Sequence, residues 1–511
     1  MLKSILIATV IASYAFNGIT QSEARSLRST RLAKDSTRAQ TPPNIVFIFA
    51  DDMGYGDVQV FNPERGKIAT PHMDALAREG MIFTDAHTSS SVCTPSRYSL
   101  LTGRYNWRTT RQVSVTGGFS KPLIPISRMT VASLLKAQGY NTAMIGKWHL
   151  GMNMPEGDGM NNIDWKGTVT GGPYDLGFDY FFGISASLDM APYIYLEDDG
   201  FVGECTTTKA FHRKGPAHAD FEAIDVLDDL AEKAVGYIQK QDASTPFFSY
   251  IALPSPHTPI VPTPEWQGKS GLGLYGDFQM QTDAFVGQIV EAINAAGLRE
   301  NTLIIVSSDN GCSKQADFPA LNAQGHYPSA QFRGSKADLW DGGHRVPFIV
   351  HWPASIKSGT QSDQLICMTD FIATCAELSG AELPADAGED SVSFLPALKG
   401  QTIESTRAGV IHHSISGHFA YRLGKYKLML AKGSGGWTSP KEKEMPKGSP
   451  KAQLYDLEKD PGETTNLYES HPEVAARLLA QLESDVARGR STAGEEAKND
   501  IENIRLWKSE K

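Results

Sequence analysis

The sequence predicts an α/β protein whose largely parallel central sheet is flanked by helices, with a smaller antiparallel sheet after it. Segments with helical spacing of apolar residues, such as 129–138 and 220–241, lie between short apolar runs that are typical of buried strands. Strands that alternate with helices form parallel sheets covered by helices. After about residue 400 the pattern changes to short alternating strands with tight turns. The apolar runs are 44–50, 247–253, 303–308 and 347–352.

The N-terminus has the parts of a secretory signal. Lys3 precedes an apolar run over 5–16, and Ser22-Glu23-Ala24 is a small-residue site that a signal peptidase could cut. The run is shorter than the about 20 residues that a membrane-spanning helix needs. We therefore expect residues 1–24 to be a signal peptide and the protein to be secreted or periplasmic, with no membrane anchor. Residues 25–43, rich in Arg, Ser and Thr, are expected to be a flexible leader.

Two folded parts are expected after the leader, and the 511 residues are enough for both. Residues 44–400 are expected to form the α/β domain that carries the functional site. Residues 401–511 are expected to form an α+β subdomain, with a hairpin over 419–430, a strand at 453–457 and a helix over 472–489. The net charge of −10 argues against a nucleic-acid partner.

Five cysteines are present, and export permits disulfides between them. Cys367 and Cys375 lie in a segment with helical spacing, where a rise of about 1.5 Å per residue separates them by roughly 12 Å. That separation is too long for a disulfide between these two. With Cys93 set aside, the other four cysteines allow three pairings.

Acidic and amide side chains follow two of the predicted strands directly. Asp51 and Asp52 come after the strand at 44–50, and Asp309 and Asn310 come after the strand at 303–308. Either pair alone would fit a surface turn. Because ligands of α/β folds gather at the carboxyl ends of strands, the two pairs together predict one site. Carboxylate and amide oxygens suit a hard divalent cation rather than zinc.

Cysteine 93 begins the most informative stretch of the chain, Cys93-Thr94-Pro95-Ser96-Arg97, with Thr102-Gly103-Arg104 after it. This stretch resembles the signature at which type I sulfatases oxidise a cysteine to formylglycine. Further similar motifs follow in the family's order, and the resemblance covers roughly 44–430 and returns at 455–467. Within that family, the chain resembles the secreted bacterial branch related to arylsulfatase A and N-acetylgalactosamine-6-sulfatases. The further motifs are Gly146-Lys147-Trp148-His149, Pro256-His257-Thr258-Pro259, Arg333-Gly334-Ser335-Lys336 and Trp340-Asp341-Gly342-Gly343-His344-Arg345-Val346-Pro347.

The resemblance implies an alkaline-phosphatase-like sandwich and a sulfatase activity that uses formylglycine (3-oxoalanine) at position 93. A formylglycine-generating or sulfatase-maturing enzyme would be a partner. A serine would become a stable sulfate ester, whereas a hydrated aldehyde has a second hydroxyl through which sulfate can be expelled. Ca²⁺ is implied as the metal, bound by Asp51, Asp52, Asp309 and Asn310 together with the oxygen of residue 93.

The resemblance also implies catalytic roles. Arg97 would hold the formylglycine hydrate and the sulfate, and Lys147 and Lys336 would neutralise sulfate oxygens. His257 would protonate the leaving alcohol, and His149 would take the proton that allows sulfate release. We expect Lys147 and His149 to point to the same side because they alternate along a strand.

Sulfated carbohydrates are the substrate class that the resemblance implies, including galactose, N-acetylgalactosamine and algal galactans. Two alternatives stay open: a phosphatase or phosphonate monoester hydrolase of the same superfamily, and a sulfated-glycan-binding protein in which Cys93 is unmodified. Polar and aromatic side chains that could contact a sugar are Asp189, Tyr193, Tyr195, His344 and the histidines in 412–418.

Overall fold

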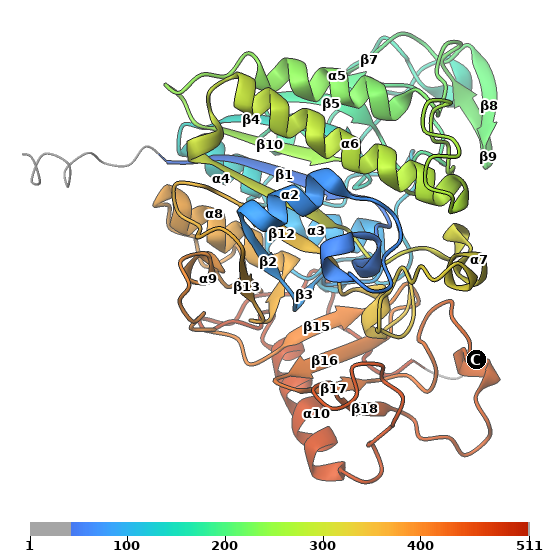
Figure 1. Ribbon diagram of the computed structural model, residues 1–511, viewed down its shortest axis with the longest axis vertical. Coiled ribbons are helices and arrows are strands. Elements are labelled where there is room, and N and C mark those ends of the chain that lie inside the picture. Colours follow the sequence, from blue (N-terminus) through green and yellow to red (C-terminus); the bar gives the residue numbers. More distant parts are fainter. Residues whose placement is uncertain (1–41, 509–511) are drawn as a thin grey trace, which may run out of the picture. The chain divides into compact units, whose positions relative to one another are not determined.

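A mixed sheet forms the centre of the larger part of the protein in the computed structural model, which describes residues 42–508 (Figure 1). The predicted signal peptide and residues 25–41 of the leader lie outside the described residues. The strand order is β13-β2-β12-β11-β1-β10-β4-β5-β6-β7, and β11, β1, β10, β4 and β5 are parallel neighbours. The strands are β1 (Asn44–Ala50), β2 (Met81–Phe83), β4 (Asn141–Lys147), β5 (Tyr180–Ile184), β6 (Leu196–Glu197), β7 (Gly200–Phe201), β10 (Phe247–Ala252), β11 (Thr302–Ser308), β12 (Phe348–His351) and β13 (Thr360–Ser362).

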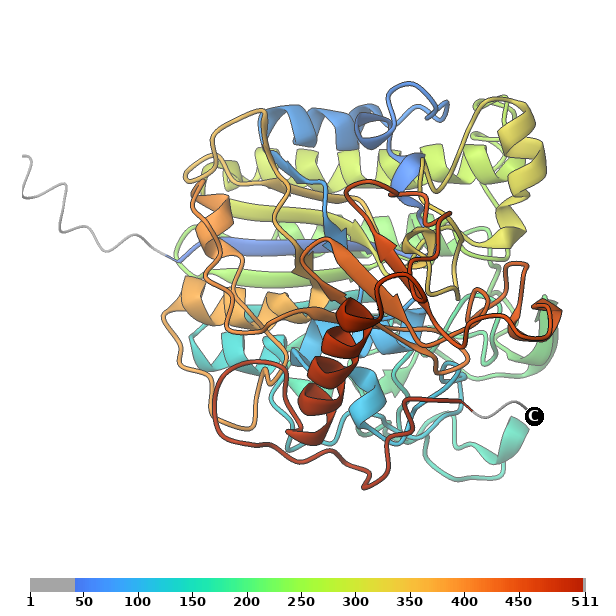
Figure 2. The ribbon, with the colours of Figure 1, turned by 90° about the horizontal axis from the view of Figure 1, so that it is seen from below.

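Two layers of helices cover the central sheet, because alternate residues of each strand point to opposite faces. On β1, Phe47 and Phe49 pack in the hydrophobic core beside α3, α4 and α8, whereas Val46 and Ile48 pack in the core beside α2, α5 and α6. Figure 2 shows the strands between these layers. The helices are α2 (Pro71–Glu79), α3 (Cys93–Thr102), α4 (Val131–Ala137), α5 (Val226–Ile238), α6 (Gly273–Ala295) and α8 (Phe371–Ser379).

A separate four-stranded antiparallel sheet follows, in the order β15-β16-β17-β18. The helix α10 (Pro472–Ala487) packs its apolar residues on one face of this sheet and lies across it in Figure 2. The strands are β15 (Val410–His413), β16 (Phe419–Leu423), β17 (Tyr426–Met429) and β18 (Gln453–Asp456). The remaining strands and α-helices are β3 (Ala86–His87), β8 (Thr207–Phe211), β9 (Arg213–Ala217), β14 (Ile366–Cys367), α7 (Phe318–Ala323) and α9 (Leu395–Leu398).

The predicted α/β class and the C-terminal antiparallel sheet are confirmed, with local corrections. The helix predicted over 220–241 begins only at Val226, after a turn. The helix α6 has no clear signal in the sequence, because Gly273, Gly276 and Gly287 lower its helix propensity. Within residues 42–508, no helix is both long and apolar enough to cross a bilayer.

The segment that carries Cys367 and Cys375 is not one helix. Cys367 lies in the short strand β14, and Cys375 lies in α8. The predicted absence of a bond between these two agrees with the structure, where all five cysteines are buried free thiols.

Candidate active site

The two predicted pairs of oxygen-bearing side chains lie side by side at one edge of the central sheet. Asp51 and Asp52 follow β1, and Asp309 and Asn310 follow β11, its parallel neighbour. The register of the two strands places Ala50 opposite Ser308, so both chains leave the sheet at the same level. The four residues are at most 1% exposed.

Two lysines hold the outer oxygens of the first pair. Lys147 at the end of β4 places its Nζ 2.6 Å from Asp51 Oδ2, and Lys336 places its Nζ 2.6 Å from Asp52 Oδ1. Burial raises the pKa of Asp51, but Lys147 and the other nearby cations lower it more, so that the net pKa lies well below its usual range. Asp51 is therefore ionised despite its burial.

The inner oxygens of the cluster have no hydrogen-bond partner among the described residues. These atoms are Asp51 Oδ1, Asp52 Oδ2 and Asn310 Oδ1. Burial, and to a smaller extent the nearby Asp51 carboxylate, raises the pKa of Asp309 to about 6. Unpaired buried oxygens fit a hard divalent cation, which would supply the partner that they lack.

Cys93 is the first residue of α3, and it faces this cluster. Its Sγ lies 3.5 Å from Lys336 Nζ and within 4.8 Å of ligand atoms of Asp51, Asp52 and His257. The helix N-terminus favours an anion here. Burial raises the pKa of the Cys93 thiol to about 12, so an unmodified cysteine would be a protonated, weak nucleophile.

Arg97 lies one turn along α3 from Cys93 and is fully buried. Its Nε and NH2 donate to Asp309 Oδ2 at 3.0 and 2.8 Å, and its NH1 donates to the carbonyl of Lys147 at 3.2 Å. Much of its donor capacity is thus used inside the protein, where it fixes the orientation of Asp309.

His257 presents one ring nitrogen to the site. Its Nδ1 lies 2.6 Å from the carbonyl of Thr258, which can only accept, so this nitrogen carries the hydrogen. The free Nε2 lies 3.7 Å from Asp52 Oδ2. Burial and the nearby Lys336 lower the pKa of His257.

Ser187 is a site residue that the sequence analysis did not predict. Its Oγ lies 3.2 Å from Lys147 Nζ and 3.3 Å from His257 Nδ1, so it links the two side chains. It lies in the loop after β5 and belongs to none of the motifs found in the sequence. Its position shortly after a strand is the one feature of the sequence that could have indicated a site residue.

The prediction that His149 alternates along a strand with Lys147 is wrong. The strand β4 ends at Lys147, and His149 has a left-handed backbone with φ of 60°. Its Nε2 lies 2.8 Å from the carbonyl of Thr116, while its Nδ1 has no partner in the part of the chain that the structure describes. Such a backbone costs about 1–3 kcal/mol and is typical of functional positions.

Most of the candidate sugar contacts lie in the protein interior. The hydroxyl of Tyr193 bonds to backbone carbonyls, and that of Tyr195 donates to Asp229 on α5 at 2.6 Å. His344 is fully buried, and both of its ring nitrogens contact other protein groups, so its predicted role as a substrate contact is not supported.

Asp189 differs from the other candidates in its surroundings. Its carboxylate lies 3.4 Å from Nε of the exposed Arg213. Its Oδ1 is buried and has no partner within residues 42–508. The histidines of 412–418 are instead in or beside the C-terminal sheet, where their rings are buried.

Comparisons with known proteins agree with this geometry. The Sulfatase family model matches residues 43–381, and the model for the C-terminal part of N-sulphoglucosamine sulphohydrolase matches residues 335–490. N-acetylgalactosamine-6-O-sulfatase of Bacteroides thetaiotaomicron is 34% identical over 504 residues, covering 89% of this chain and 95% of the relative. Human arylsulfatase A is 34% identical over 484 residues, covering 88% and 90%.

Solved structures are similar over the same length. One from work on glycosaminoglycan metabolism by Bacteroides thetaiotaomicron has a TM-score of 0.77 at 33% identity, covering 87% of this chain and 99% of that one. A phosphonate monoester hydrolase of Agrobacterium radiobacter, at 19% identity and a TM-score of 0.57, shares the fold alone. The chain therefore belongs to the sulfatase family, and it is a sulfuric ester hydrolase with an alkaline-phosphatase-like fold.

Proposed function

We propose that this sulfatase hydrolyses sulfate esters of galactose- or N-acetylgalactosamine-containing carbohydrates, with formylglycine at position 93 and Ca²⁺ as its metal. The observation that carries the chemistry is the ring of unpaired buried oxygens beside Cys93, with two lysines behind it. Oxygen atoms supply all the ligands proposed, which favours Ca²⁺ over zinc. The relative named for N-acetylgalactosamine 6-sulfate supports the sugar class.

The two absent groups would supply distinct chemistry: the hydrated aldehyde offers a nucleophilic hydroxyl with a second hydroxyl for release, and the metal neutralises sulfate charge. Asp51, Asp52, Asp309 and Asn310 would hold the metal together with the oxygen of residue 93. Arg97 is then a positioning residue for Asp309 as well as a donor at the nucleophile, since its bonds to that carboxylate are already made.

The chain's own cations and histidines divide the remaining work. Lys147 and Lys336 stabilise negative charge on the sulfate oxygens as the ester bond breaks. His257 donates a proton from Nε2 to the leaving alcohol, which requires the doubly protonated ring because Nδ1 already carries the hydrogen that faces Thr258. His149 Nδ1, which has no partner among the described residues, accepts the proton whose loss allows sulfate to leave.

Export and maturation complete the proposal. The residues before the described structure have the pattern of a signal peptide, and a maturation enzyme would convert Cys93 in the exported or exporting chain. The substrate side chains are proposed to include Asp189, whose buried Oδ1 lacks a partner among residues 42–508 and could accept a sugar hydroxyl.

Two measurements test the proposal. The peptide mass at residue 93 distinguishes formylglycine from cysteine, and turnover on defined sulfated saccharides locates the sugar and the sulfate position. We expect release from N-acetylgalactosamine or galactose 6-sulfates. Turnover on phosphonate esters with none on any sulfated sugar would contradict the proposed substrate class.

A further inference from the structure

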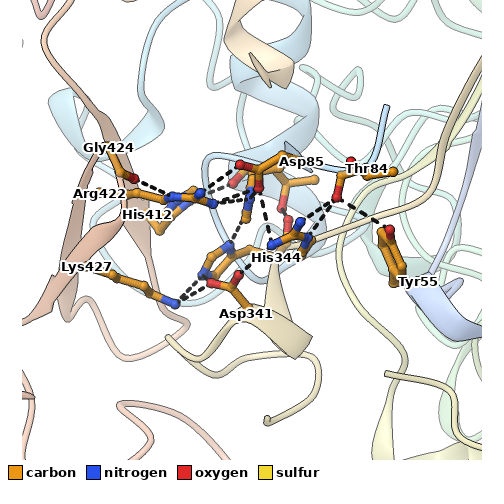
Figure 3. A network of polar contacts seen from close by, with 12 residues as sticks. Tyr55, Thr84, Asp85, Asp341, His344, His412, Arg422, Gly424 and Lys427 are labelled. Carbon is orange, nitrogen blue, oxygen red and sulfur yellow. Dashed lines mark hydrogen bonds and ion pairs between the residues drawn. The ribbon is translucent and has the colours of Figure 1, made fainter. Parts of the chain in front are cut away.

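A second cluster of possible metal ligands lies where the catalytic domain meets the C-terminal sheet (Figure 3). His87 lies on β3, His344 directly follows the short helix at Asp341–Gly343, and His412 lies on β15. One ring nitrogen of each histidine lies within 4.8 Å of the others, and all three side chains are fully buried. None of the three belongs to the set of oxygen ligands beside Cys93.

The outward nitrogen of each ring faces a hydrogen-bond acceptor. A carboxylate or a carbonyl oxygen accepts, so the nitrogen that faces it carries the hydrogen and the other ring nitrogen is a lone pair. Outer partners of this kind are typical of metal-bound histidines. The contacts are His87 Nε2 with Asp85 Oδ1 at 2.8 Å, His344 Nε2 with the Leu339 carbonyl at 3.0 Å, and His412 Nδ1 with the Thr88 carbonyl at 3.0 Å.

The inward nitrogens have no such partner. His87 Nδ1 and His344 Nδ1 lie 3.0 Å apart, and they are two lone pairs facing each other in the tautomers in which both outer nitrogens carry the hydrogen. His412 Nε2 is buried with no hydrogen-bond partner among residues 42–508. A buried unpaired nitrogen and two opposed lone pairs are both unfavourable, and one cation that accepts all three nitrogens removes both problems.

Two cations of the protein lie near the outer nitrogens and are balanced by carboxylates. Lys427 Nζ is 3.1 Å from His344 Nε2 and bonds to Asp341 and Glu463 at 2.8 Å. Arg422 NH1 is 3.1 Å from His87 Nε2 and bonds to Asp85. Lys427 can only donate, so the alternative to a metal is a His344 ring whose Nε2 accepts from Lys427 and whose Nδ1 donates a hydrogen to His87 Nδ1.

Metal binding requires neutral histidine rings whose free nitrogens point at the ion. Burial and the nearby cations and rings hold the pKa values of His344 and His412 well below the ordinary value, so both rings are neutral, the form that binds metal. Their rings are stacked with centroids 3.8 Å apart and planes 12° apart. His412 must therefore turn about its broad χ2 torsion for its Nε2 to converge on the ion.

We propose that His87, His344 and His412 form a structural site for one zinc-class transition-metal ion, with water as the fourth ligand. Imidazole ligands favour Zn²⁺ over Ca²⁺, which separates this site from the oxygen cluster. The ion would tie β15 of the C-terminal sheet to β3, from which residues 88–92 lead to Cys93. The proposal does not depend on the catalytic assignment.

Zinc content of the full-length protein tests the proposal directly. The protein is produced with zinc in the medium and dialysed against excess Ca²⁺, and its zinc is measured by mass spectrometry. We expect about one zinc per chain in the wild type, almost none in His412→Gln, and an unchanged content in Asp309→Asn, the matched control at the oxygen cluster. Zinc lost in Asp309→Asn but kept in His412→Gln would assign it to the oxygen cluster and overturn the proposal.

A second measurement needs no variant, in case His412→Gln does not fold. Zinc is removed from the wild type with a chelator in the presence of Ca²⁺, and Co²⁺ is added while the visible spectrum is recorded. We expect the intense bands of tetrahedral cobalt, together with a rise in Tm when zinc is returned. A wild type that contains no zinc and gives no such bands, with an unchanged Tm, shows that a shared proton joins the rings instead.

Discussion

The sharpest test of the catalytic roles is the substitution His257→Ala, measured on leaving groups of different basicity. The carbonyl of Thr258 occupies Nδ1, so Nε2 is the nitrogen of this ring that can reach a substrate. A sugar alkoxide needs a proton as it leaves, whereas a nitrophenolate is stable without one. General acid catalysis contributes about 10²–10⁴ in rate, which corresponds to roughly 2.7–5.5 kcal/mol.

We expect His257→Ala to lower turnover of a sulfated sugar by this factor, and turnover of nitrophenyl sulfate by about tenfold or less. The assay follows sulfate release from both substrates at saturating concentration. His149→Ala is the matched control, because a step after the alcohol has left slows both substrates alike. The metal content of both variants is measured as well, since His257 Nε2 lies 3.7 Å from Asp52. Equal losses on the two substrates for His257→Ala would refute the proton-donor role.

Three further predictions concern the nucleophile, the metal and the fold. Cys93→Ala should abolish sulfate release and leave Tm within a few degrees of the wild type, by calorimetry. Chelation should abolish turnover, and Ca²⁺ but not Zn²⁺ should restore it in a sulfate-release assay. Asp390→Asn should lower the free energy of unfolding by about 3–5 kcal/mol in a urea titration at pH 7, because it breaks the buried pair with Arg108 at 2.8–2.9 Å.

The Asp390 effect has a defined pH dependence. Burial raises the pKa of Asp390, but Arg108 and the hydrogen bonds from Tyr105 and Ser491 together lower it more, so the folded-state pKa lies below the unfolded value of about 3.9. The stabilisation is therefore present above about pH 4 and is lost as the pH falls through the folded-state pKa. The difference in unfolding free energy between wild type and Asp390→Asn should shrink below pH 4 and stay constant above pH 6.

The proximity of Asp51 and Asp52 to Asp309 and Asn310 could be predicted from the sequence because it follows from topology. Asp51 and Asp309 each end an apolar run, and neighbouring parallel strands bring such ends together. Ser187 could not be predicted in this way, because its contact with Lys147 depends on the path of an irregular loop after β5. His149 was predicted to lie on a strand, but its backbone is left-handed. The error has a related cause, since no pattern in the sequence marks the end of β4.

The candidate substrate contacts were harder to predict from the sequence. Tyr193 and His344 were named as sugar contacts because their side chains can bind a sugar. The residue type does not show whether the polar group of a side chain already has a hydrogen-bond partner within the protein. In the structure, the hydroxyl of Tyr193 bonds to backbone carbonyls and the ring of His344 contacts His87. Asp189 stays a candidate because one of its buried oxygens has no partner within the described chain.

Three buried oxygens without a hydrogen-bond partner among the described residues lie in the cluster that follows β1 and β11, where we expect a cation. Each costs about 1–3 kcal/mol when left without a partner, so Asp51 Oδ1, Asp52 Oδ2 and Asn310 Oδ1 together oppose folding of the metal-free chain. A cation that binds only the folded state stabilises it by mass action, by about 2.7 kcal/mol at a concentration 100-fold above its Kd. We expect Ca²⁺ to raise Tm of the chelated protein. Asn310→Leu removes one of these oxygens and should weaken that rise, which calorimetry measures; an undiminished rise would place the Ca²⁺ elsewhere.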